Sequence, residues 1–146
     1  MADPKEIRVG DRLGSFQRAT GFQHWNRYAA VNDEFVPIHM DDEAGLAAGY
    51  PSAFGMGNLQ WAYLHNLLRQ WMGESGDIAA LSCQFRGANT KGQTVTAEGT
   101  VTALHPGGER LEVEVDVWTE EQNGSKLAVG KATVVFDVVA PQDRSA

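Results

Sequence analysis

The sequence contains only one cysteine, Cys83, so it can form neither an internal disulfide nor a cysteine-rich zinc site. Cys83 lies in an alternating apolar stretch, a position that favours a buried structural thiol. No apolar run reaches the roughly 18 residues that a membrane-spanning helix requires. The first nine residues lack the apolar block of a signal peptide, and we therefore expect a cytoplasmic protein.

Basic residues are also scarce, with 12 lysines and arginines against 19 acidic residues and a formal net charge of −7. No run of more than two basic residues occurs, so we expect neither nucleic acid nor a membrane surface as a partner. A chain of 146 residues that is 42% hydrophobic suits one domain with one core. We expect this single domain to have its core over about residues 8–138, with frayed ends at residues 1–5 and 141–146.

The first half of the chain carries signals for helices. The spacing of Thr20 and Gln23 is that of a capping box, which predicts that a helix opens at Thr20. Pro37 forbids regular helix in the loop that follows. Asp41 can then cap a short second helix over residues 42–48.

The second half predicts a sheet around a long helix. Residues 56–72 are apolar over most of a helical circumference, as is usual for an enclosed helix. Four later segments alternate apolar and polar residues, which predicts an antiparallel sheet with one wet face: residues 79–86, 95–103, 111–118 and 128–138. Together they predict an α+β hot-dog fold, in which one curved sheet wraps around the central helix. The free edge of such a sheet favours dimerisation.

Two short motifs carry the chemical information. One is Glu34-Phe35-Val36-Pro37-Ile38-His39, and the other is Phe54-Gly55-Met56 at the start of the long helix. They resemble the motifs D-F-x-P-x-H and His-Gly-Met of the MaoC-like family, which includes the R-specific enoyl-CoA hydratases. The resemblance implies a lyase that acts on an acyl thioester of coenzyme A or acyl carrier protein. We expect no cofactor, and no metal site because no second histidine lies at ligand spacing from His39.

The resemblance also implies roles for three residues. Glu34 and His39 would hold one water that adds to C3 of a trans-2-enoyl thioester, or is lost in the reverse dehydration. Histidine suits this role because it exchanges a proton near neutral pH. The N–H of Gly55, at the helix start, would stabilise the negative charge on the thioester oxygen.

The chain departs from the family pattern at three positions. Glu34 replaces the usual aspartate, and Asp33 is an alternative carboxylate. Val36 stands where the family often has asparagine, and Phe54 replaces the histidine before the glycine. We expect Val36 and Phe54 to contact the substrate together with Met56.

Two basic residues, Arg86 and Lys91, are candidates to meet the phosphates of coenzyme A, although each can equally be ordinary surface charge. Each residue of the motifs also has a simpler interpretation. His39 can be a surface histidine beside the second helix, Glu34 a solvated loop charge, and Gly55 a residue that permits a tight turn.

Two other functions remain open. The three departures are compatible with a non-catalytic or half-catalytic subunit that pairs with a different hot-dog chain rather than with its own copy. A thioesterase is the less favoured alternative, because many thioesterases of this fold place a carboxylate on the central helix. Residues 56–72 contain no aspartate or glutamate.

Overall fold

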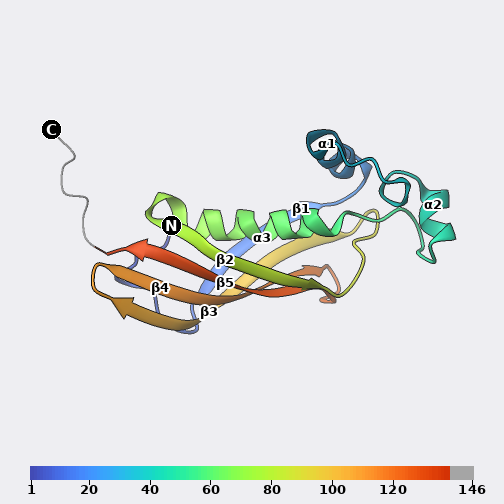
Figure 1. Ribbon diagram of the computed structural model, residues 1–146. Helices are drawn as coiled ribbons and strands as arrows, with labels where there is room; N and C mark the ends of the chain where they lie inside the picture. Colours follow the sequence, from blue (N-terminus) through green and yellow to red (C-terminus); the bar gives the residue numbers. More distant parts are fainter. Residues whose placement is uncertain (139–146) are drawn as a thin grey trace.

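The computed structural model describes residues 1–138, in which a five-stranded antiparallel sheet carries one long helix across one face (Figure 1). The strands are ordered β1-β3-β4-β5-β2 in the sheet. Their bounds are β1 Arg12–Ala19, β2 Gly76–Phe85, β3 Thr94–Gly107, β4 Arg110–Glu121 and β5 Lys126–Asp137. The long helix is α3, Gly57–Met72. The α+β hot-dog architecture is therefore confirmed.

Alternating burial makes the sheet. In β4, every second residue from Leu111 to Glu121 is buried against the helix, while the intervening residues face outward. Glycines with positive φ allow the tight connections before β3, between β3 and β4, and between β4 and β5: Gly92, Gly108 and Gly124. The four strands that alternation predicts are all present, and each is longer than the predicted segment.

One strand was missed by the sequence analysis. β1 pairs with β3, and its register shifts between Arg12 and Ser15. This irregularity breaks the alternation, so that only Leu13 and Phe16 of the strand are buried. The remaining side chains of β1 are exposed, and the strand therefore gives little hydrophobic signal.

The core lies between α3 and the sheet, and it includes Leu64, Leu67 and Leu68, each at most 1% exposed. The composition of the helix suggested that it is enclosed on every side, but in the structure one side is open. Trp61 is 39% exposed on the face that points away from the sheet. At the amino terminus, the amide of Ala2 donates to the carbonyl of Trp71 near the end of α3, at 2.7 Å. Residues 141–146 lie outside the described residues.

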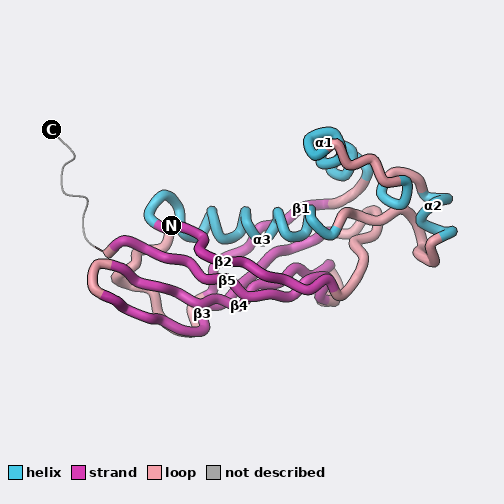
Figure 2. The backbone as a smooth tube through the Cα atoms, in the orientation of Figure 1, coloured by secondary structure: helices cyan, strands magenta, loops and turns pink. Residues whose placement is uncertain are grey.

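A second, smaller cluster of buried side chains joins α1, Phe22–Asn32, to the segment just before α3. The 3-10 turn η1, Pro37–His39, and α2, Asp42–Ala47, lie beyond the same end of α3 (Figure 2). The buried residues of the cluster are Trp25, Ala29, Ala53 and Met56. All the residues of the two sequence motifs lie in this region or on the loop that leads to α3.

The caps of the two short helices differ in outcome. Asp41 caps α2 as expected, with its carboxylate accepting from the amide of Glu43 at 3.1 Å. The capping box at Thr20 was wrong, because α1 starts after Gly21 and has no side-chain cap. The hydroxyl of Thr20 instead donates to the carbonyl of Gln93 at 2.8 Å, so this side chain joins the end of β1 to the loop before β3.

Candidate active site

His39 is buried at the end of η1, with 8% of its surface exposed. Its Nδ1 lies 2.7 Å from the carbonyl oxygen of Phe54. Because a carbonyl only accepts hydrogen bonds, Nδ1 must carry the proton of the neutral ring. The other nitrogen, Nε2, is then left with a lone pair and can accept a proton. The interpretation of His39 as a surface histidine therefore does not describe this structure.

Glu34 and Asp33 stand together where α1 ends, but they differ in exposure. Asp33 adopts a left-handed conformation with φ 54°, and its amide closes the helix on the carbonyl of Ala29. The side chain of Asp33 is exposed, whereas Glu34 is half-buried. Of the two carboxylates, Glu34 is the one that the chain folds towards the protein.

The surroundings of Glu34 include one tyrosine. Burial raises the pKa of the Tyr28 hydroxyl above its ordinary value, and the nearby charge of Glu34 raises this pKa further. Within residues 1–138, no hydrogen bond or ion pair joins Glu34 to His39.

Gly55 does not offer the hydrogen bond that its motif predicts. Its amide donates to the carbonyl oxygen of Asn89 at 2.7 Å and is therefore already engaged. Close packing also explains why a glycine, which has no side chain, stands at this position. A Cβ at this position would stand 2.7 Å from Nε1 of Trp25 and 3.1 Å from Oδ1 of Asn89. The expected role of the Gly55 amide as the free donor to a substrate oxygen is corrected accordingly.

At the start of α3, no side chain among the described residues caps the helix. The amide of Leu59 donates to the carbonyl of Met56 at 3.1 Å, whereas the amides of Gly57 and Asn58 have no hydrogen-bond partner within residues 1–138. The first amides of an α-helix have no partner within the helix, and they point out of its amino-terminal end. The ring of Phe85, which is 51% exposed, lies over Gly57, where an added Cβ would be 2.8 Å from the ring. An apolar side chain thus borders these amides.

The predicted substrate-contacting residues lie in different environments. Val36 is 38% exposed, whereas Met56 is 1% exposed and belongs to the small cluster. The ring of Phe54 stands edge-on to His39 and also packs on Tyr50, with centroids 5.3 Å and 4.2 Å away. Arg86 is exposed, and its guanidinium donates to Gln84 at 2.8 Å. Sequence reasoning missed Tyr50, which extends the aromatic surface beside His39.

Asp42 is a second residue that the motifs did not reveal. Its carboxylate accepts from the amide of Ala53 at 3.1 Å and pairs with Lys91 at 2.5 Å. The hydrogen bond from Lys91, followed by the one from Ala53, lowers the pKa of Asp42. Lys91 also lies 4.8 Å from the ring centre of Phe22. Lys91 therefore has two partners within the protein. Through Asp42, it helps to fix the loop before α3, and it is not a cation that is free to meet a substrate phosphate.

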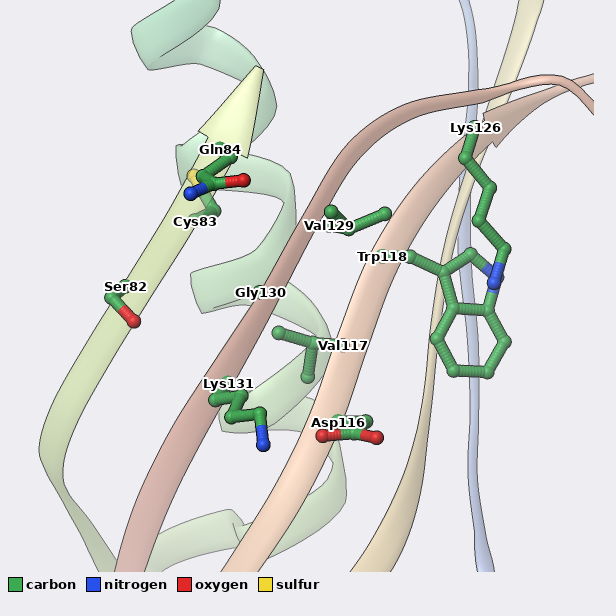
Figure 3. Close-up of a pocket in the computed structure, with 10 residues that line it drawn as sticks. All are labelled: Ser82, Cys83, Gln84, Asp116, Val117, Trp118, Lys126, Val129, Gly130 and Lys131. Atoms are coloured by element: carbon green, nitrogen blue, oxygen red, sulfur yellow. The ribbon is translucent and has the colours of Figure 1, made fainter. Parts of the chain in front are cut away.

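A hollow lies elsewhere, on the outer face of the sheet (Figure 3). It is formed by β2, β4 and β5, and α3 runs behind these strands. Trp118, Lys126 and Lys131 are among its lining residues, and the Lys126 ammonium is 4.4 Å from the centre of the Trp118 ring. None of the residues predicted to act on or contact a substrate lines this hollow.

Over residues 1–138, no three histidine, cysteine, aspartate or glutamate side chains gather in a way that could hold a metal ion. In the same part of the chain, every helix is too short or too polar to cross a bilayer.

Comparison with known families shows to which family the chain belongs. A family model described as a MaoC like domain matches residues 11–123. The chain belongs to the MaoC-like domain family. This membership supports a hydratase or dehydratase activity in general terms. A comparison with curated proteins gave no match.

Solved structures share the fold of this MaoC-like chain. The (R)-hydratase from A. caviae involved in PHA biosynthesis is 24% identical, with a TM-score of 0.81 over 89% of this chain and 97% of that one. A MaoC-like dehydratase from Rhodospirillum rubrum is 22% identical, with a TM-score of 0.81 over 93% and 97%. The ChsH1-ChsH2 complex from Mycobacterium tuberculosis has a matching chain, 19% identical, with a TM-score of 0.79 over 88% and 98%.

Proposed function

We propose that this protein hydrates a trans-2-enoyl thioester, or dehydrates the corresponding 3-hydroxyacyl thioester, with Glu34 and His39 as its catalytic residues. The observation that carries the proposal is the bond between Nδ1 of His39 and the carbonyl of Phe54. It fixes the tautomer in which Nε2 is a base, inside a buried setting. A half-buried carboxylate stands on the same short segment.

The chemical step follows from these two groups. Water held between Glu34 and His39 loses a proton to Nε2 as its oxygen bonds to C3 of the substrate. The electron pair of the C2–C3 double bond moves towards the thioester carbonyl, whose oxygen gains negative charge. The proton now on Nε2 is then delivered to C2, which gives the 3-hydroxyacyl thioester and restores the neutral imidazole. The reverse sequence eliminates water.

The donor for the thioester oxygen is assigned to the first turn of α3 rather than to Gly55. The Gly55 amide is used by Asn89, whereas the uncapped helix start directs free amides outward. Such amides, with the positive end of the helix dipole, stabilise a developing oxyanion. Gly57 is the first residue of this turn.

The acyl group is proposed to be apolar. Three exposed or half-exposed apolar side chains belong to the segments that carry the site: Phe35 at 57%, Tyr50 at 40% and Val36 at 38%. Coenzyme A and acyl carrier protein are both acceptable thioester carriers, and Arg86 is the exposed cation proposed to meet a carrier phosphate.

Assembly with a second hot-dog chain is part of the proposal. Strand β2 lies at an edge of the sheet, and its residues Ile78, Leu81 and Cys83 pack on the core while remaining only partly buried. A homodimer would cover this edge. The alternative is a hetero-oligomer in which this chain is a half-catalytic subunit. The likeness to chains of the ChsH1-ChsH2 and HadBC complexes supports considering it.

The test follows the loss of the enone absorbance when the purified protein is mixed with trans-2-enoyl-CoA substrates of increasing chain length. Stereospecific formation of a 3-hydroxyacyl-CoA supports the proposal. The same assay with a partner chain co-purified from the native host separates the homodimer from the hetero-oligomer. Binding of every substrate without turnover, alone and with the partner, contradicts hydration.

A further inference from the structure

Asn89 is nearly completely buried, at 1% exposed, in the loop between β2 and β3. Its backbone carbonyl accepts the amide hydrogen of Gly55 at 2.7 Å. The next residue, Thr90, forms an isolated antiparallel bridge with Phe54. This loop therefore holds the strand-like segment that leads into α3.

The amide of Gly55 and the carbonyl of Phe54 belong to one peptide group. That carbonyl is the acceptor for Nδ1 of His39, at 2.7 Å. A peptide group is planar and rigid, so its N–H and C=O cannot turn independently. The position of the Asn89 carbonyl thus sets the tilt of the peptide group, and this tilt sets the direction of the carbonyl that orients the imidazole.

The side chain of Asn89 is fixed in turn by neighbouring polar groups. Its Nδ2 donates to Oγ1 of Thr20 at 2.8 Å and lies 3.2 Å from Oε1 of Gln93. The Gln93 oxygen also accepts the amide hydrogen of Thr90 at 2.9 Å. Thr20 directly follows β1 and Gln93 directly precedes β3, so these bonds anchor Asn89 beside two neighbouring strands.

We infer that Asn89 is a positioning residue for His39, acting through the Phe54–Gly55 peptide group. The inference rests on the proposed function, in which His39 is the base. It explains why the Gly55 amide is not free, because that amide completes the chain of hydrogen bonds from Asn89 to the imidazole. Hydrogen bonds in such a chain polarise one another, so the Asn89 contact also strengthens the Phe54 carbonyl as an acceptor.

The experiment combines kinetics with ¹⁵N nuclear magnetic resonance of the histidine rings in the full-length protein. In the wild type, His39 shows a protonated Nδ1 and an unprotonated Nε2, and the signals are assigned with His39→Ala. In Asn89→Ala, the anchoring bonds are lost and the ring nitrogens show averaging between tautomers. The value of kcat falls by about 10-fold to 100-fold, as for lost outer-shell partners, while KM stays within about two-fold.

A matched pair at Gln93 separates positioning from general damage. Gln93→Glu keeps the oxygen that accepts from Asn89 and Thr90, and it retains the wild-type signals and rate. Gln93→Leu loses both bonds, so its His39 ring-nitrogen signals and its rate should change in the same direction as those of Asn89→Ala. Val134→Ala, a buried core variant on β5, lowers the melting temperature but leaves the His39 signals unchanged.

Wild-type ring-nitrogen signals in both Asn89→Ala and Gln93→Leu overturn the inference, whatever their rates. If the wild-type protein has no hydratase activity, the proposed function fails, and the magnetic resonance comparison still decides whether Asn89 orients His39.

Discussion

The sheet of β3, β4 and β5 and the loop between α2 and α3 are held in place in different ways. In the sheet, each strand is hydrogen-bonded along its length, and the inward side chains of Val113, Val115 and Val117 are at most 1% exposed. In the loop, individual peptide groups depend on single partners, such as Asp42 for Ala53 and Asn89 for Gly55. Damage to the sheet should therefore lower stability, whereas damage to the loop should lower the rate.

The largest effect on the rate among these loop variants is expected for Gly55→Ala. The added Cβ meets Nε1 of Trp25, a residue with no exposed surface, and displaces the peptide group that orients His39. A shift of about 1 Å at a catalytic group can cost about 100-fold in rate, and we expect a loss of kcat/KM of that size. Gly107→Ala is the matched control, because its Cβ would enter open space. Equal rates for the two variants would refute the role given to Gly55.

In the sheet-and-helix core, Leu68→Ala tests the other half of the comparison. Leu68 has no exposed surface, and its truncation leaves a cavity. The free energy of unfolding, measured by urea denaturation, should fall by about 2–5 kcal/mol. The rate per folded molecule at low temperature should stay within about two-fold of the wild type, since α3 keeps its amino-terminal turn. A rate loss like that of Gly55→Ala would show that the two regions are not separable.

A smaller effect is expected for Asp42→Asn. The amide oxygen of asparagine still accepts from Ala53, but the pairing with the Lys91 ammonium loses its charge. Because both side chains are about two-fifths exposed, the loss in kcat/KM should be only about two-fold to five-fold. The same variant in 1 M salt should differ less from the wild type, because salt screens the pair. A loss of kcat/KM that grows with salt would contradict this account of the Asp42–Lys91 pair.

The smallest effect on the rate belongs to Glu121→Gln, in the turn between β4 and β5. Hydrogen bonds from the amides of Asn123 and Ser125 lower the pKa of Glu121 below its ordinary value of 4.5. A carboxylate with a lowered folded-state pKa stabilises the protein above pH 4.5, and this contribution disappears as the pH falls through the folded-state pKa. Glu121→Gln should reduce the free energy of unfolding at neutral pH and make this free energy depend less on pH in the acid range. The rate should stay unchanged.

Local patterns made much of the fold predictable. Alternation located four strands, and the apolar content of residues 56–72 located α3 to within one residue. The strand β1 was missed because its register shift leaves only Leu13 and Phe16 buried. The capping box at Thr20 failed because α1 begins after Gly21 and the Thr20 hydroxyl donates to the carbonyl of Gln93 instead.

The site was predictable only where neighbours in the sequence define it. Glu34 and His39 are recognisable because they share one short motif, and the roles given to them remain proposals. The partner of the Gly55 amide was not predictable, because Asn89 lies in the loop between β2 and β3, which comes after α3 in the sequence. Nothing local to either residue signals that contact.

The most direct measurement of the central claim is a double-mutant cycle in the hydration assay, with Glu34→Ala, His39→Ala and the double variant. If both side chains hold one water, each single variant loses at least about 100-fold in kcat/KM, and the double variant loses little more than either. Melting temperatures near that of the wild type would show that the losses are chemical. Wild-type rates in all three variants would contradict the assignment of the water-activating pair.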